Sequence, residues 1–148
     1  MKVEDLLKSK DQTVFTIRPE EPIASALAQL LEHQIGSLVV CDDEKIFGII
    51  SERDILRAIA GNRNALDQKK VRDEMTPNLI VAIPDDELSY VMGIMTQNRI
   101  RHLPIVTKTG LVGIVSIGDI VKFLLEETET KNRYLEEYIY GSNITLMD

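Results

Sequence analysis

The sequence contains two copies of one pattern, separated by a constant shift of 65 residues. Residues 14–56 align without a gap with residues 79–121, and eight of the 43 aligned positions are identical. The identical pairs are Pro19/Pro84, Ile35/Ile100, Leu38/Leu103, Gly48/Gly113, Ile49/Ile114, Ser51/Ser116, Asp54/Asp119 and Ile55/Ile120. Many of the remaining pairs keep their apolar character. Self-similarity over this length predicts that one small structural unit occurs twice in the chain.

The first half of each copy is predicted to form a strand followed by a helix. Residues 14–17 are a β-prone run, and Pro22 suits the first turn of a helix. Apolar residues then recur at helical spacing, which gives the helix one apolar face. Gly36 is expected to end this helix. The second copy repeats the helical spacing with Leu88, Val91, Met92 and Met95.

The second half of each copy is predicted to form two strands and another helix. Strands are expected at residues 38–41 and 46–50, joined by a polar turn, and Ser51 is expected to begin a helix that runs toward Gly61. The corresponding strands of the second copy are residues 102–106 and 111–115, with Ser116 at the start of the last helix.

Domain boundaries follow from the repeat. We expect repeat 1 at residues 3–60, a polar linker at 61–70, repeat 2 at 71–125 and a C-terminal helix and tail at 126–148. One copy has too little core for its size, whereas two stacked copies bury the apolar faces of both sheets. The expected fold class is α/β (α+β), with two pseudo-symmetric β-α-β-β-α repeats, two equivalent crevices between them, and a long C-terminal helix.

A Ser-x-x-Asp motif stands at the start of the last helix in each copy, from Ser51 to Asp54 and from Ser116 to Asp119. As local structure it is a capping box, and the aspartate interacts favourably with the helix dipole by about 0.3–1 kcal/mol. The same geometry offers N–H groups and a hydroxyl to a phosphate, while the carboxylate suits a ribose diol. The motif alone leaves both interpretations open, and the second describes a nucleoside phosphate site.

Cationic side chains near the motif favour the binding interpretation. Arg53 lies inside the first motif, and Arg101 and His102 begin the central strand of the second copy. A charge-assisted hydrogen bond contributes roughly 1.5–3 kcal/mol. The chain as a whole is acidic, with 17 Lys+Arg against 24 Asp+Glu and a formal charge of −7, which argues against general nucleic-acid binding. Local binding of phosphate is compatible with this charge.

Composition also argues against several other classes. The single Cys41 cannot form an internal disulfide, and the two histidines with one cysteine provide no Cys/His set for a metal. No nucleophile–base pair is visible, so we expect no enzyme. The sequence has no apolar run near the ~20 residues of a membrane helix and no apolar stretch typical of a signal peptide. We therefore expect a cytoplasmic protein that does not enter a membrane.

The repeat resembles a tandem pair of cystathionine-beta-synthase (CBS) domains, also called a Bateman module. The matching segments are residues 16–20, 35–40, 48–54, 100–106 and 113–119, and the likeness covers roughly residues 3 to 125. The chain is similar to stand-alone members that consist of one such pair. The resemblance implies a regulatory module without catalysis of its own and without an obligatory cofactor. Its ligand would contain adenosine: AMP, ADP, ATP, NAD(H) or S-adenosylmethionine.

The resemblance also implies ligand positions in the two crevices between the repeats. One site would place Thr16, Ile17, Ile35, Gly36, Ser37 and Leu38 around the base, Asp119 on the ribose, and Ser116 with His102 on the phosphate. The other would use Ile83, Ile100, Arg101, His102, Leu103 and Pro104, with Asp54 on the ribose and Ser51 with Arg53 on the phosphate. Two departures separate the copies, because Val81 replaces Thr16 and Gly118 replaces Arg53. We therefore expect the two sites to differ in affinity.

The C-terminal segment predicts a long helix, continuous or interrupted. Its apolar spacing continues through Leu125, and after polar residues 126–133 a second apolar group precedes Gly141 as a helix stop. That group consists of Tyr134, Leu135, Tyr138 and Ile139. It either folds back on its own domain or contacts another subunit. The resemblance favours a homodimer, since family members commonly pair through their helices.

Two other functions remain open at this point. The chain could be a protein-interaction scaffold with vestigial crevices, whose association depends on the helix around residues 134–139. It could also be a small hydrolase or nucleotide-converting enzyme, which has the weakest support. The sequence does not identify the protein that such a module would regulate.

Overall fold

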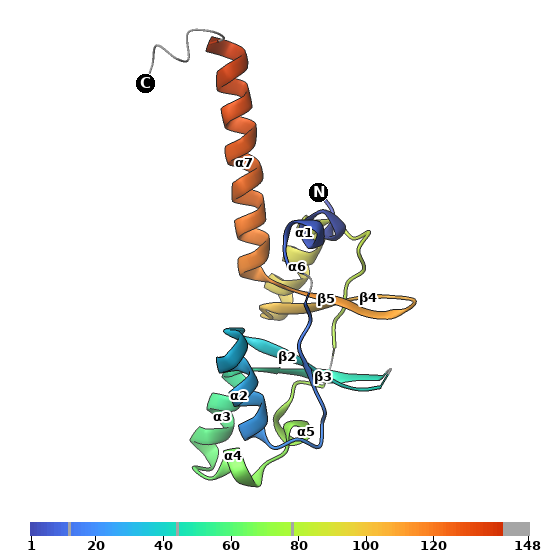
Figure 1. Ribbon diagram of the computed structural model, residues 1–148, viewed down its shortest axis with the longest axis vertical. Coiled ribbons are helices and arrows are strands. Elements are labelled where there is room, and N and C mark those ends of the chain that lie inside the picture. The colour runs from blue at the N-terminus through green and yellow to red at the C-terminus, as the bar shows by residue number, and fades with distance from the viewer. Residues whose placement is uncertain (12, 44, 78, 141–148) are drawn as a thin grey trace.

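The computed structural model of the protein describes residues 1–11, 13–43, 45–77 and 79–140. Two small sheets lie one above the other, with helices on their outer sides, and the C-terminal helix projects away from the body (Figure 1). The elements are α1 (Val3–Ser9), β1 (Thr16–Ile17), α2 (Ile23–His33), β2 (Ser37–Asp42), β3 (Lys45–Ser51), α3 (Glu52–Gly61), α4 (Ala65–Gln68), α5 (Val71–Glu74), α6 (Leu88–Asn98), β4 (His102–Thr107), β5 (Gly110–Ser116) and α7 (Ile117–Tyr140).

The two sheets have equivalent pairing, which confirms the predicted order of strand, helix, two strands and helix. In the first repeat β1 pairs parallel with β2, and β2 pairs antiparallel with β3. In the second repeat β4 pairs antiparallel with β5, and a single parallel bridge from Ala82 to Ile105 takes the place of the first strand. The registers shift at equivalent points, between Val40 and Cys41 and between Ile105 and Val106.

Two predicted helix boundaries were wrong by a short distance. Pro22 is the N-cap residue that precedes α2, so it lies just outside the first turn. Gly36 does not end α2, because Gln34 does so in a left-handed conformation with φ of 54°. Arg99 ends α6 in the same way with φ of 56°. A left-handed residue at this place satisfies the last carbonyl groups of a helix and turns the chain toward the next strand.

The linker contains more helix than the sequence indicated, and the tail forms the predicted long helix. The region predicted as a polar linker, residues 61–70, includes α4, whose Ala65 is fully buried in the core of the first repeat. The C-terminal helix α7 is continuous from Ile117 to Tyr140. Gly141, the expected helix stop, lies outside the described residues. None of the described helices has the length and apolar character needed to span a membrane.

The apolar core consists of two clusters, one in each repeat. Each cluster also contains a short helix that, in the chain, directly precedes the other repeat. Val3, Leu6 and Leu7 of α1 pack in the cluster of the second repeat. Val71 of α5 packs in the cluster of the first repeat. Each chain segment after these helices therefore crosses from one repeat to the other, as Figure 1 shows for the paths between α1 and β1 and from α5 upward. Because the two short helices are exchanged between the repeats, two extended segments pass the junction of the sheets.

Candidate functional site

Two cavities lie at the junction of the repeats, and both repeats line each of them. The first crevice, of about 370 Å³, lies between the start of α3 and the start of β4. The second crevice, of about 400 Å³, lies between the start of β2 and the start of α7. Gly36 and His102 line both. The crossing segments contribute Thr76 to the first crevice and Lys10, Asp11 and Thr13 to the second.

The repeat shift relates the two crevices position by position. Eight positions of the first crevice have their counterparts, 65 residues away, in the lining of the second. The pairs are Ile49/Ile114, Ser51/Ser116, Asp54/Asp119, Thr76/Asp11, Arg99/Gln34, Ile100/Ile35, Arg101/Gly36 and His102/Ser37. The two crevices are therefore equivalent sites related by the repeat, each lined by both copies but with different side chains.

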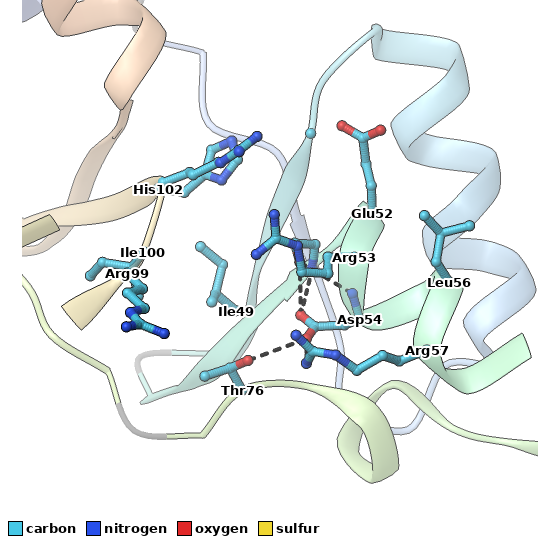
Figure 2. Close-up of a pocket in the computed structure, with 13 residues that line it drawn as sticks. Ile49, Glu52, Arg53, Asp54, Leu56, Arg57, Thr76, Arg99, Ile100 and His102 are labelled. Carbon is cyan, nitrogen blue, oxygen red and sulfur yellow. Dashed lines mark hydrogen bonds and ion pairs between the residues drawn. The ribbon is translucent and has the colours of Figure 1, made fainter. Parts of the chain in front are cut away.

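In the first crevice the Ser-x-x-Asp motif forms the predicted capping box. The Ser51 N–H and hydroxyl donate to Asp54 Oδ2 at 2.8 and 3.0 Å, and the Asp54 N–H donates to Ser51 Oγ at 3.3 Å. Asp54 Oδ1 is engaged less closely, by the Thr76 hydroxyl at 3.4 Å and by Arg57 Nη1 at 3.7 Å. One carboxylate oxygen thus holds the helix start, while the other faces the crevice (Figure 2).

In the second crevice the equivalent carboxylate carries a charged partner. Asp119 Oδ2 accepts hydrogen bonds from the Ser116 N–H at 2.9 Å and from Lys10 Nζ at 2.8 Å. Lys10 Nζ also donates to the Ile114 carbonyl at 2.9 Å. Burial acts to raise the pKa of Asp119, but the hydrogen bonds from Lys10 and Ser116 outweigh it and hold that pKa below its usual range. Asp119 therefore stays ionised at neutral pH.

His102 stands between the two crevices. Burial lowers its pKa, against the opposing influence of the Asp119 and Glu52 carboxylates, so the imidazole is neutral at pH 7. Gly36 lies directly against it, because a Cβ at Gly36 would come within 3.2 Å of His102 Nε2 and 2.9 Å of Glu52 Oε1. The absence of a side chain at residue 36 keeps the space between the crevices open.

The structure brings together most of the side chains predicted for each site. Six predicted residues line the first crevice: Ser51, Arg53, Asp54, Ile100, Arg101 and His102. Six predicted residues line the second: Ile35, Gly36, Ser37, His102, Ser116 and Asp119.

Six other predicted residues lie elsewhere. Ile17, Leu38 and Leu103 are buried in the apolar clusters, Pro104 is also buried, Ile83 is exposed, and Thr16 lines a separate surface hollow next to Arg18. Side chains alternate between the faces of a strand, so Ser37 and His102 face the crevices while Leu38 and Leu103 face the cores. The prediction treated whole segments as lining and did not separate their two faces.

Sequence reasoning missed the side chains that the crossing segments and helix ends supply. Lys10 was missed because nothing in the sequence places the segment after α1 beside the second repeat. Phe15 and His33 also line the second crevice and stack with ring centroids 3.6 Å apart. Arg99 could have been predicted, because the repeat alignment places it at a helix end two residues before Arg101. Arg57 could have been predicted as well, because it follows Arg53 by one helical turn and therefore lies on the same helix face.

Comparison with known proteins places this geometry in a family. The model of the CBS domain matches residues 3–61 and 71–126. The CBS domain-containing protein CBSX3, mitochondrial, of Arabidopsis thaliana is 34% identical over 94% of this chain and 72% of its own length. The crystal structure of the CBS-domain containing protein ATU1752 from Agrobacterium tumefaciens superposes with a TM-score of 0.79 at 40% identity, over 82% of this chain and 98% of that one.

A third relative has been crystallised with ligands. The CBS domain pair of protein MJ0100, in complex with 5′-methylthioadenosine and S-adenosyl-L-methionine, has a TM-score of 0.74 to this structure. It is 28% identical, over 86% of this chain and 98% of that one. The two equivalent sheets, the two crevices related by the repeat and the two segments matched by the family model all indicate the same doubled domain. The chain belongs to the CBS domain family, as a tandem pair in the manner of stand-alone CBS-domain proteins.

Proposed function

We propose that this protein is a regulatory module that binds an adenosine-containing ligand in the crevices between its repeats and carries no catalysis of its own. The observation that supports this most is the paired placement of Asp54 and Asp119. Each carboxylate sits at a helix start and faces a cavity that the other repeat helps to line. A carboxylate in this position accepts hydrogen bonds from the two hydroxyls of a ribose.

The chemistry around each carboxylate supports an adenosine nucleotide. Each cavity joins apolar side chains, such as Ile49 and Ile100 in the first crevice, to polar groups near a helix start. Such a mixture suits the base and the ribose of an adenosine ligand, and a helix start accompanied by cationic side chains also suits a phosphate. The relative MJ0100 was crystallised with two adenosyl compounds, which supports the same class here. AMP, ADP, ATP and NAD(H) are the phosphate-bearing ligands we propose.

Calorimetric titration of the ligand-free protein with AMP, ADP, ATP, NADH and S-adenosylmethionine tests the proposal. We expect at least one to bind, and we expect Asp54→Ala and Asp119→Ala each to weaken one site by roughly tenfold or more. Asp73→Ala is the matched control. Asp73 accepts an equivalent capping bond from the Lys70 N–H at 2.9 Å but lines neither crevice, so this variant keeps full affinity. Absence of binding by all five ligands contradicts the proposal.

We further propose that the module acts as a homodimer that contacts another copy through its helices. Val121 and Leu125 of α7 are 45% and 58% exposed, and Leu56 of α3, the repeat equivalent of Val121, is 66% exposed. Exposed aliphatic groups at equivalent positions of two helices suit a subunit contact. The same observation favours the alternative function, a protein-interaction scaffold with vestigial crevices. That alternative predicts normal association with no heat from any adenosine ligand.

A further inference from the structure

Three arginines distinguish the first crevice from the second. Arg53, Arg99 and Arg101 all line the first crevice. The shift of 65 residues relates these positions to Gly118, Gln34 and Gly36, and the latter two line the second crevice. The first crevice therefore has a guanidinium at three positions whose counterparts in the other copy are all uncharged.

The arginines of the first crevice are available to a ligand. Among the described residues, Arg53, Arg99 and Arg101 have no carboxylate within ion-pair distance. Arg57 supplies a fourth guanidinium, 3.7 Å from Asp54 Oδ1. Figure 2 shows Arg53 and Arg57 on the α3 side and Arg99 on the facing side. With Glu52 and Asp54 as the only carboxylates in the described lining, four guanidinium groups leave a positive balance.

The cation of the second crevice is already engaged. Lys10 Nζ donates both to Asp119 Oδ2 at 2.8 Å and to the Ile114 carbonyl at 2.9 Å. Asp11 adds another carboxylate to the same lining. A phosphate bound there would have to draw Lys10 away from Asp119 and would lie near Asp11, and like charges at short range repel.

We propose that the two crevices divide adenosine ligands by the charge of their 5′ group: the first binds a ligand that bears phosphate, and the second binds one without phosphate. This division rests on the proposed function, since it takes both crevices to hold an adenosine group. A phosphate gains bidentate, charge-assisted hydrogen bonds from guanidinium groups. A neutral 5′ group leaves the ion pair between Lys10 and Asp119 undisturbed, so the second crevice accepts it without losing that pair.

AMP and 5′-methylthioadenosine are matched probes, because they share adenosine and differ in the 5′ group. Calorimetric titration with each probe, alone and with the other at saturation, is expected to show one site for each and no competition. Arg53→Met and Arg101→Met are each expected to weaken AMP by roughly 10- to 100-fold and to leave 5′-methylthioadenosine unchanged. Arg63→Met makes the same change at an exposed residue that lines neither crevice, and it leaves both affinities unchanged.

A gain of binding provides the converse test. The double variant Gln34→Arg and Gly118→Arg puts guanidinium groups at the two positions that are equivalent, by the repeat, to Arg99 and Arg53 of the first crevice. The backbone accepts both, because Arg99 already adopts the φ of Gln34 and a Cβ on Gly118 has its nearest contact at 3.6 Å, to Ser116 Oγ. We expect a second AMP site to appear in this variant.

The outcomes separate the two levels of the proposal. Competition of both probes for one site, AMP affinity unaffected by the arginine variants, or no second AMP site in the double variant each overturns the division by charge. Those results leave the binding of adenosine ligands intact. Binding of neither probe to the wild-type protein overturns the proposed function and the division with it.

Discussion

Asp54 and Asp119 each hold a helix start and also line a crevice, and this explains why their motif is ambiguous in the sequence. One oxygen of each carboxylate closes a capping box with Ser51 or Ser116. The other oxygen of Asp54 faces the first crevice, engaged only by Thr76 and Arg57 at 3.4 and 3.7 Å. Capping and ligand binding are thus compatible at one residue, because a carboxylate has two oxygens with separate partners.

His102 gives the protein a predicted pH dependence. Its pKa is lowered by burial, so the unfolded state takes up a proton at a higher pH than the folded state. Stability is therefore present above the unfolded pKa of about 6.5 and declines as the pH falls through that value toward the folded pKa. Urea unfolding of the wild type and of His102→Gln between pH 7.5 and 5.5 measures this. The wild type is expected to lose more stability than the variant, and equal losses would contradict the assignment.

Residue positions are predictable from the sequence where local spacing sets a contact, and they are not where the tertiary structure sets it. Ser51 and Asp54 were found because a capping motif is local. Thr16 and Ile17 were placed at a ligand by resemblance, yet one faces a separate hollow and the other the core. Lys10 could not be found, since its role depends on a contact with Asp119, 109 residues away.

The two repeats use the same strand glycine against different neighbours. A Cβ on Gly48 would lie 2.5 Å from the Thr76 carbonyl oxygen, which pairs with the Ile49 N–H at 3.1 Å. A Cβ on the equivalent Gly113 would meet a Leu7 methyl group at 2.9 Å. The backbone beside Gly48 can move only by breaking its pairing with β3, whereas the Leu7 side chain can rotate. The crossing segment at Thr76 is thus held against the first crevice by a close approach of two backbones.

Substituting these two glycines is expected to reduce the free energy of unfolding by unequal amounts. Gly48→Ala is expected to reduce the free energy of unfolding by about 1–3 kcal/mol, since the added carbon displaces backbone in a packed region. Gly113→Ala is expected to cost less, because a flexible side chain absorbs the change. Chemical denaturation of both variants compares them. A larger loss for Gly113→Ala would show that the segment at Thr76 is not restrained as described.

Helices and strands were predictable because apolar periodicity and capping residues are carried by short segments. The strands near residues 38–41 and 102–106 and the helix start at Ser51 all follow from such patterns. Helix α4 was missed, because residues 61–70 are polar apart from a few small or apolar side chains, and Ala65 is buried only through contact with the first repeat. Local composition cannot show a contact of that kind.

The assembly of the whole chain depends on an exchange of short helices. Helix α1 packs with the second repeat and α5 with the first, so neither repeat has a complete core from consecutive residues. The exchange also brings Lys10 and Thr76 to the crevices. The same packing that completes the two cores therefore supplies side chains to the two sites. The sequence shows the repeat but not which repeat α1 and α5 pack against, because that contact is set by the tertiary structure.

Opposite core substitutions test this exchange. Leu6 is 1% exposed in the cluster of the second repeat. Leu6→Ala is expected to reduce the free energy of unfolding by about 2–5 kcal/mol. Hydrogen exchange should then accelerate more in β4 and β5 than in β2 and β3. Val71→Ala, in α5, is expected to show the reverse pattern. Faster exchange in β2 and β3 after Leu6→Ala would contradict the packing of α1 on the second repeat.

The central claim is that the crevices between the repeats bind an adenosine group through Asp54 or Asp119. A crystal structure of the protein grown with saturating AMP tests it most directly. We expect a nucleotide in the first crevice, with its ribose hydroxyls on Asp54 and its phosphate among Arg53, Arg99 and Arg101. Density for AMP elsewhere on the surface, or empty crevices at saturating AMP, would contradict it.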